Sequence, residues 1–159
     1  MNPDITFVRL SEISIDDLIQ HMSDQRVAKH MPLLSSDIIW NLKTAEDFIA
    51  MKEQYWEKDG LGHWAFLSDG NYVGWGGFQK ENQEWDFGLV LKPDHFGMGM
   101  CITKKAINFA KDNKNIPFMT FLLPPSRTNL KGLNRLGATY LGKVDYEGTA
   151  FLKYRLETQ

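Results

Sequence analysis

Residues 86–110, DFGLVLKPDHFGMGMCITKKAINFA, form the stretch that decides the fold. Its first part is typical of a strand, in which Leu89 and Leu91 face one way and Asp86, Gly88 and Val90 face the other. A proline then ends the strand. Further on, apolar side chains recur at the spacing of one helical face, at positions 102, 106, 109 and 110. The stretch therefore predicts a strand, a tight turn and a helix.

The turn between this strand and this helix carries two glycines, in FGMGMC at residues 96–101. Glycine lets backbone N–H groups turn toward one point, and the start of a helix adds the positive end of its dipole. A helix N-terminus stabilises a nearby anion by about 0.3–1 kcal/mol besides the direct hydrogen bonds. The turn is therefore a candidate phosphate-binding site, although packing is the alternative explanation for such glycines.

The residues before this unit predict one strand and two helices. Ile5–Leu10 is β-branched and aromatic enough for a strand, and Ser14 is a candidate cap for a helix that runs through about Ala28. A loop is expected over residues 31–43. The second helix should begin at Thr44, end near Asp59, and bury one face with Phe48, Met51 and Tyr55.

Three extended runs follow, Trp64–Leu67, Tyr72–Phe78 and Glu84–Leu91, separated by turn-forming residues. They predict an antiparallel meander. Glycines at positions 74, 76 and 77 should mark a bend or a close backbone approach in its middle strand. The remaining expected elements are a buried strand at Pro117–Leu123, a short helix at Thr128–Leu136 ended by Gly137, and a hairpin of Tyr140–Val144 with Thr149–Leu156.

Composition limits the functional classes. A chain of 159 residues with ordinary apolar content favours one domain, residues 1–159. The formal charge of −2 gives no reason to expect nucleic acid as a partner. No apolar run approaches the roughly 18 residues that span a bilayer, so we expect no membrane partner and a cytoplasmic location. A single cysteine and four histidines without ligand spacing predict neither a disulfide nor a metal site.

The order of elements resembles the GNAT N-acetyltransferase fold over nearly the whole chain. The family's acetyl-CoA motif reads approximately V-x-P-x-x-Q/R-G-x-G-x-G/A, and the residues here in those places are Leu91, Pro93, Phe96, Gly97, Met98, Gly99, Met100 and Cys101. Phe96 replaces the usual glutamine or arginine, and Cys101 the usual glycine or alanine. A second motif is matched by Ser126, Asn129, Leu136, Gly137 and Ala138. The N-terminal ITFVRLSEIS and Trp64 further resemble the subgroup that acetylates ribosomal-protein N-termini.

This resemblance implies an α/β fold with a mixed, twisted sheet of about seven strands and about four helices. It implies that the strand ending at Leu91 diverges from the next one and that the pantetheine arm of acetyl-CoA enters between them. The implied cofactor-binding residues are Leu89, Val90, Leu91, Phe96, Gly97, Met98, Gly99, Met100, Cys101 and Asn129. Acetyl-CoA is then the cosubstrate, no metal is required, and a homodimer is expected by analogy.

The reaction implied is direct attack of an amine on the thioester. A base must first take a proton from the ammonium, and Asp86 is the first candidate, with Glu84 and Asp145 as alternatives. Many relatives protonate the leaving thiolate with a tyrosine, but that position here is Leu133. Ser126, Tyr140 or bulk water would have to serve instead.

Several alternatives stay open at this point. Cys101 lacks an evident histidine partner, so we expect it to pack rather than react. Lys104, Lys105 and Arg127 either reach the 3′-phosphate of CoA or are simply solvated. Trp40 either lines an acceptor pocket or covers the core. The acceptor is a protein N-terminus or a small-molecule amine, and the competing functions are a non-catalytic acyl-CoA-binding module and a structural domain.

Overall fold

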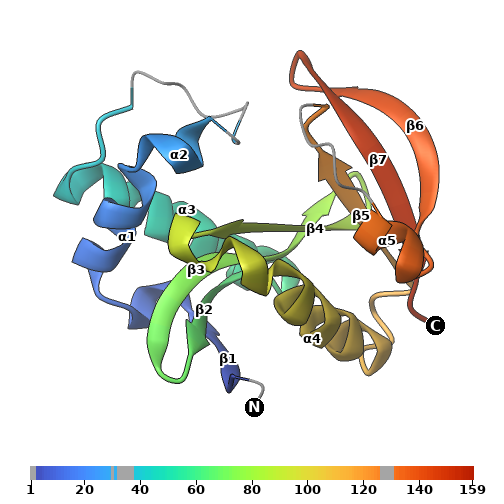
Figure 1. Ribbon diagram of the computed structural model, residues 1–159, viewed down its shortest axis with the longest axis horizontal. Helices are drawn as coiled ribbons and strands as arrows, with labels where there is room; N and C mark the ends of the chain where they lie inside the picture. The colour runs from blue at the N-terminus through green and yellow to red at the C-terminus, as the bar shows by residue number, and fades with distance from the viewer. Residues whose placement is uncertain (1–2, 30, 32–37, 126–130) are drawn as a thin grey trace.

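One seven-stranded sheet runs through the protein (Figure 1). The structure, a computed structural model, describes residues 3–29, 31, 38–125 and 131–159. The strand order is β1-β2-β3-β4-β5-β7-β6, and only the β4–β5 pair is parallel. The strands are β1 Ile5–Arg9, β2 His63–Ser68, β3 Asn71–Glu81, β4 Glu84–Leu91, β5 Phe118–Leu123, β6 Thr139–Tyr146 and β7 Thr149–Glu157. The expected mixed sheet of about seven strands is confirmed.

The helices divide between the two faces of this sheet. They are α1 Ile15–Met22, α2 Gln25–Ala28, α3 Leu42–Asp59, α4 Gly99–Lys111 and α5 Lys131–Arg135, with 3-10 turns at Leu10–Glu12 and Pro93–Met98. Helices α1–α3 contribute to one apolar cluster, whereas α4 and the segment around α5 contribute to the other. None of the helices in the described ranges is long and apolar enough to cross a bilayer.

The first predicted helix is two helices. Ser23 ends α1, and Asp24 has an extended backbone and accepts a hydrogen bond from the Arg26 amide at 2.9 Å. Aspartate is among the best N-cap residues, so Asp24 starts a new helix instead of continuing the old one. This break gives five α-helices among the described residues where about four were expected.

The predicted start of α3 was also wrong, and of its predicted buried face only Met51 was wrong, since Phe48 packs on an apolar cluster and Tyr55 is half-buried. Asn41, not Thr44, caps the helix, because its side chain accepts the Thr44 amide at 2.9 Å. Met51 is 44% exposed, while Ala45 and Lys52 are buried. A lysine can bury its aliphatic stem, so the polarity pattern put Met51 on the buried face in place of its neighbour Lys52.

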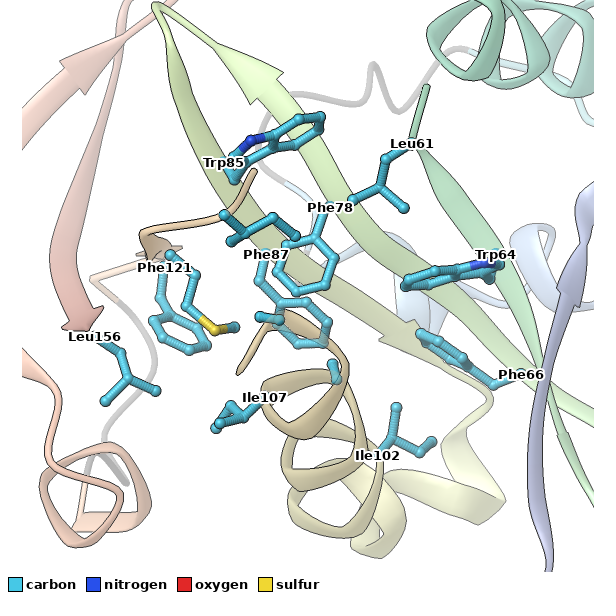
Figure 2. Close-up of a cluster of buried hydrophobic side chains, with 14 of the residues drawn as sticks. Leu61, Trp64, Phe66, Phe78, Trp85, Phe87, Ile102, Ile107, Phe121 and Leu156 are labelled. Carbon is cyan, nitrogen blue, oxygen red and sulfur yellow. The ribbon is translucent and has the colours of Figure 1, made fainter. Parts of the chain in front are cut away.

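The larger apolar cluster lies between the sheet and α4. Figure 2 shows Phe78 and Phe87 at its centre, with Ile102 and Ile107 reaching up from α4. Its two largest fully buried side chains, Phe66 and Phe78, come from the β2–β3 hairpin. The cluster fixes α4 against β4, and this contact determines where the α4 N-terminus points.

Strand β3 comes unusually close to β4 at its glycines. A Cβ on Gly74 would lie 2.5 Å from the Val90 carbonyl oxygen, and one on Gly76 would meet that of Gly88. Only glycine fits at these positions, so the expected close backbone approach is confirmed. β4 is thereby held along its whole length on this side, with register pairs from Gly74–Leu91 to Glu81–Glu84.

Candidate active site

Strands β4 and β5 separate after two residue pairs. Their register contains only Trp85–Met119 and Asp86–Thr120, although β4 continues to Leu91 and β5 to Leu123. In Figure 1 the β5–β7–β6 part of the sheet turns away from β1–β4. Backbone groups of residues 87–91 therefore have no strand beside them on this edge. The divergence that the family resemblance implied is confirmed, and Asp86 lies at its vertex.

The turn after β4 is helical. Residues Pro93–Met98 form a 3-10 turn that runs directly into α4, and the amide of Gly99 donates to the Phe96 carbonyl. Neither Gly97 nor Gly99 has a positive φ. The sequence prediction that both glycines turn free amides toward a ligand is therefore wrong for Gly99. In the structure, Gly97 and Gly99 instead keep the turn open because they have no side chains.

The turn nevertheless fits the diphosphate of acetyl-CoA. A Cβ added at Gly97 would meet nothing within 4 Å, and one at Gly99 only the tips of Leu91 and Leu89, at 3.8 and 4.0 Å. Among the described residues, no side chain caps the N-terminus of α4. Phosphate groups favour such a terminus because of its dipole and its amides. The open edge of β4 leads from the vertex to this terminus.

The other expected cofactor residues lie around the same turn. Phe96 is 48% and Met100 38% exposed, and Cys101 is an exposed free thiol, while Met98 packs on the apolar cluster. Packing was therefore the wrong prediction for Cys101. Leu89 and Leu91 face α4, and Val90 faces the α1–α3 side, as the alternation predicted. Ser126, Arg127 and Asn129 lie outside the described residues.

Asp86 has the environment of a base. Its Oδ1 accepts a hydrogen bond from the Thr120 hydroxyl at 3.1 Å, across the last β4–β5 pair. Burial raises the pKa of Asp86 to about 7; the hydrogen bond from Thr120 opposes this rise, and the negative charge of Glu81 supports it. A general base works best with a pKa near the working pH. Thr120 is only 2% exposed, so the pair is fixed.

Asp86 opens onto a polar pocket of about 130 Å³. Its lining residues come from β3 through β7: Glu81, Asn82, Glu84, Asp86, Thr120, Leu122, Val144, Asp145, Tyr146 and Lys153. All three carboxylates that the sequence offered as bases are thus brought together. Glu84 accepts a salt bridge from the Lys153 ammonium at 2.7 Å, and Asp145 is exposed at the rim. Asp86 is the one with a strongly raised pKa.

Sequence reasoning missed Thr120, Glu81 and Tyr146 in this pocket. Burial raises the pKa of Tyr146 to about 12, with further contributions from the charge of Glu81 and a hydrogen bond to it. The alternation in β5, where Met119 and Phe121 face the core, was a usable signal for Thr120. Nothing local pointed to Glu81 or Tyr146, which meet only when the sheet forms.

The remaining candidates are placed as follows. Leu133 packs on the core. The Tyr140 ring lies tilted against that of Tyr154, with 5.2 Å between the ring centres, and Tyr140 is not among the residues that line the pocket. The Lys105 ammonium donates to the Ile5 carbonyl and lies over the Phe7 ring, so its role is structural. Trp40 packs edge-on against Phe48 at 5.3 Å. Within the described ranges, no three His, Cys, Asp or Glu side chains gather as metal ligands do.

Solved structures share this architecture. An acetyltransferase from Agrobacterium tumefaciens str. C58 matches with a TM-score of 0.74 and 17% identity, covering 99% of this chain and 93% of its own. The Campylobacter jejuni N-acetyltransferase PseH in complex with acetyl coenzyme A matches with a TM-score of 0.69 and 16% identity, and the match covers 98% of this chain and 100% of PseH. YncA from Salmonella typhimurium with its cofactor acetyl-CoA matches with a TM-score of 0.72 and 13% identity, and the match covers 98% of this chain and 94% of YncA. Such identities establish a common fold.

The family itself is established by sequence. No curated protein matches the chain significantly. The model of the acetyltransferase (GNAT) domain, however, matches residues 4–139, which include the diverging strands, the open turn and the vertex aspartate. This chain therefore belongs to the GNAT acetyltransferase family.

Proposed function

We propose that the protein is an N-acetyltransferase that transfers the acetyl group of acetyl-CoA to a primary amine by direct attack. The observation that carries the proposal is the position of Asp86, a carboxyl group with a pKa near 7 at the vertex where β4 and β5 part. On one side of it lies the open strand edge, and on the other the polar pocket. The two substrates would meet at this point.

Asp86 acts as the base. A primary ammonium has a pKa of roughly 8 to 10, so the acceptor arrives protonated and must lose a proton before it can attack. A carboxylate whose own pKa is near 7 takes that proton much more readily than one near 4. The backbone of residues 89–91 pairs with the pantetheine arm, and an amide of β4 supports the developing negative charge on the thioester oxygen.

The open turn at the start of α4 holds the diphosphate. Gly97 and Gly99 leave room for it, and the α4 terminus would supply its dipole and the amides of Met100 and Cys101, since the Gly99 amide already donates to Phe96. Phe96 and Met100 lie exposed beside this turn, where they can cover the bound cosubstrate. Asn129 belongs to the same proposal through the second family motif. Ser126 or solvent protonates the leaving thiolate.

A transfer assay tests this function. Purified protein is incubated with acetyl-CoA and a panel of primary amines and peptides with free N-termini, and thiol release and acetylated product are measured. Calorimetry records acetyl-CoA binding in parallel. We expect binding and turnover with at least one acceptor. Absence of both would refute the proposal.

A non-catalytic acyl-CoA-binding module is the second candidate. It is favoured by Leu133, which packs on the core where many relatives carry an acidic phenol. This module would bind acetyl-CoA without turnover, and Asp86→Ala would change only its stability. Turnover that depends on Asp86 excludes it.

The pocket lining bears on which amines the protein acetylates. Carboxylates outnumber the single lysine in the pocket lining, which suits a protein N-terminus or a small amine in its ammonium form. The resemblance to the ribosomal-protein subgroup favours the former. We further propose a cytoplasmic location, and a homodimer by analogy with the family. Mass spectrometry of cell extracts treated with the protein and labelled acetyl-CoA would identify the acceptor.

A further inference from the structure

A buried lysine without a carboxylate partner lies behind the acceptor pocket. Lys52 is on α3, is only 8% exposed, and forms no salt bridge with the acidic side chains that the structure describes. Its ammonium lies 5.0 Å from the centre of the Trp75 ring and 5.4 Å from that of Phe48. Burying a cation costs free energy unless other contacts compensate. A lysine in such a place therefore calls for a functional reason.

The ammonium of Lys52 has one direct hydrogen-bond partner, the side-chain amide of Gln79. Its Nζ donates to Gln79 Oε1 at 3.2 Å, and Gln79 Nε2 donates to Glu81 Oε1 at 2.6 Å. The amide thus points its oxygen at the cation and its N–H₂ at the carboxylate, which is the favourable orientation for both. The three side chains form an ion pair bridged by an amide, running from the interior to the pocket wall.

This bridge lies beside the proposed base. Gln79 and Asp86 are direct register partners across β3 and β4, and directly opposed residues share one face of a sheet. Glu81, two residues further along β3, is on that face too. It lines the same pocket as Asp86. The base and the end of the bridge are therefore neighbours.

The two carboxylates have opposite surroundings. Asp86 is desolvated, and burial raises its pKa. Glu81 instead accepts a hydrogen bond from the Gln79 amide, whose oxygen is in turn bound by the Lys52 ammonium. Two carboxyl groups made different by their environments are suited to different tasks, one to accept a proton and one to bind a cation.

The other acidic groups of the pocket are less suited to hold a cation. Glu84 is engaged by Lys153 at 2.7 Å. Asp145 is exposed at the rim, where solvent weakens its attraction for a charged ligand. Glu81 alone combines a place on the wall with a buried cation that fixes its carboxylate.

We propose that Glu81 binds the ammonium group of the acceptor before its proton passes to Asp86, and that Lys52 is a positioning residue that holds Glu81 through Gln79. The inference rests on the proposed acetyl transfer. The ammonium R–NH₃⁺ gives one proton to the Asp86 carboxylate, and the neutral amine then attacks the thioester carbonyl. As the new C–N bond forms, the C–S bond breaks and CoA leaves as thiolate, which solvent protonates, while the second amine proton passes to solvent.

The test compares acceptor and cosubstrate constants in three variants. Glu81→Gln, Lys52→Met and their double mutant are assayed with 1,4-diaminobutane and with a tripeptide that has a free N-terminus. We expect Glu81→Gln to raise the acceptor KM at least about tenfold, as for a lost hydrogen bond to a charged group, with the acetyl-CoA Kd within about twofold of the original. Lys52→Met should raise the acceptor KM in the same way.

The double mutant separates positioning from general damage. If Lys52 acts through Glu81, the double mutant is no worse than Glu81→Gln alone. Lys43→Met, which removes an exposed lysine paired with Asp47 on the same helix, should leave both constants within about twofold. Effects of Lys52→Met and Glu81→Gln that multiply, or an unchanged acceptor KM in Glu81→Gln, would overturn the proposal.

A pH profile gives a second readout. The groups that act on Asp86 are Glu81, Glu84, Lys153 and the Thr120 hydroxyl. Of these, the negative charge of Glu81 raises the pKa of Asp86. Glu81→Gln should therefore shift the acidic limb of kcat/KM to lower pH, and an upward shift or none would contradict the arrangement. Should Lys52→Met not fold, Gln79→Met breaks the same bridge and must raise the acceptor KM.

These outcomes are distinct from failure of the proposed function. If the unmodified protein acetylates no amine, both proposals fall. If it is active and loses activity in Asp86→Asn, while Glu81→Gln keeps its acceptor KM, only the role of Glu81 falls.

Discussion

The two edges of β4 differ sharply. On the β3 side, eight register pairs run from Gly74–Leu91 to Glu81–Glu84, and glycines bring the backbones close. On the β5 side, two pairs are followed by separation. The same strand is therefore fully satisfied on one edge and open on the other. Because an unpaired edge attracts another extended chain, we propose that the open edge is the binding surface and that the closed edge holds it in place.

The comparison also explains where the chemistry lies. Asp86 and Thr120 form the last pair before the strands part, so the proposed base is anchored by paired sheet and lines the pocket beyond it. A carboxylate further along β4 would lack this anchor. One nearer the start of the strand is Glu84, which Lys153 already neutralises. Changes at the vertex and along the open edge should therefore separate catalysis from binding.

The largest effect is expected at the vertex. Asp86→Asn keeps the shape of the side chain but removes the base, so kcat should fall by about 10²–10⁴-fold, with little change in acetyl-CoA affinity. Steady-state kinetics and calorimetry measure the two quantities. Asp112→Asn at the end of α4 is the matched control. A kcat within threefold of the original would remove Asp86 from the reaction.

The open edge is tested by Gly99→Glu. The new Cβ makes only ordinary contacts with Leu89 and Leu91, so the fold should persist, while the carboxylate repels a diphosphate at the start of α4. We expect acetyl-CoA affinity to fall by about 100-fold, or roughly 2.7 kcal/mol. Gln20→Glu on α1 adds the same charge elsewhere and should bind normally. Intact binding in Gly99→Glu would place the diphosphate at another site.

Stability offers an independent view of the vertex. Asp86 has a folded-state pKa of about 7, above its unfolded value of 3.8, so the folded protein binds its proton more tightly. The group therefore destabilises the fold as pH rises from about 4 to 7. Because the folded and unfolded pKa values differ by about 3, Asp86→Asn should be more stable by up to about 4 kcal/mol at pH 8, with the difference vanishing near pH 4. Urea unfolding at both pH values checks this, and a pH-independent difference would contradict it.

A smaller change is expected from Thr120→Val, which removes the hydrogen bond to Asp86 and keeps the shape. Because that bond lowers the pKa of Asp86, its loss should move the acidic limb of kcat/KM upward by roughly 0.5–1 pH unit. Thr103→Val, at a buried threonine on α4, controls for lost stability. If the acidic limb of kcat/KM stays in place or moves to lower pH, the Thr120 hydroxyl does not control the pKa of the base.

The smallest effect should come from Cys101→Ser. The thiol is exposed in the first turn of α4, and the transfer needs no covalent intermediate on the protein. Kinetic constants should stay within about twofold. A loss of more than tenfold, or an acetylated Cys101 detected by mass spectrometry, would indicate a two-step reaction instead.

The fold was largely predictable because its signals are local. The strand ending at Leu91, the helix after Gly99 and the hairpin closing the chain all follow from periodicity and turn residues. The errors are local too, since Asp24 starts a new helix and Lys52 takes a buried place next to Met51. Caps and snorkelling lysines depend on side-chain contacts that a hydrophobic pattern does not contain.

The site was predictable only where one segment forms it. Asp86 and the α4 turn lie within 25 residues of each other, and the family motif covers them. The pocket combines β3, β4, β5, β6 and β7, so Glu81, Thr120, Tyr146 and Lys153 come together only through strand order. In the bridge, Lys52 contacts Gln79, which lies 27 residues further along the chain, and Gln79 contacts Glu81 on the same strand. Sequence spacing does not reveal the first of these contacts.

The most direct test is a crystal structure of the protein with acetyl-CoA. We expect the pantetheine arm between β4 and β5, with the diphosphate at the α4 N-terminus and the acetyl group beside Asp86. A structure in which β4 and β5 pair beyond Asp86–Thr120, or in which acetyl-CoA lies elsewhere, would contradict the assignment of this edge as the place of transfer.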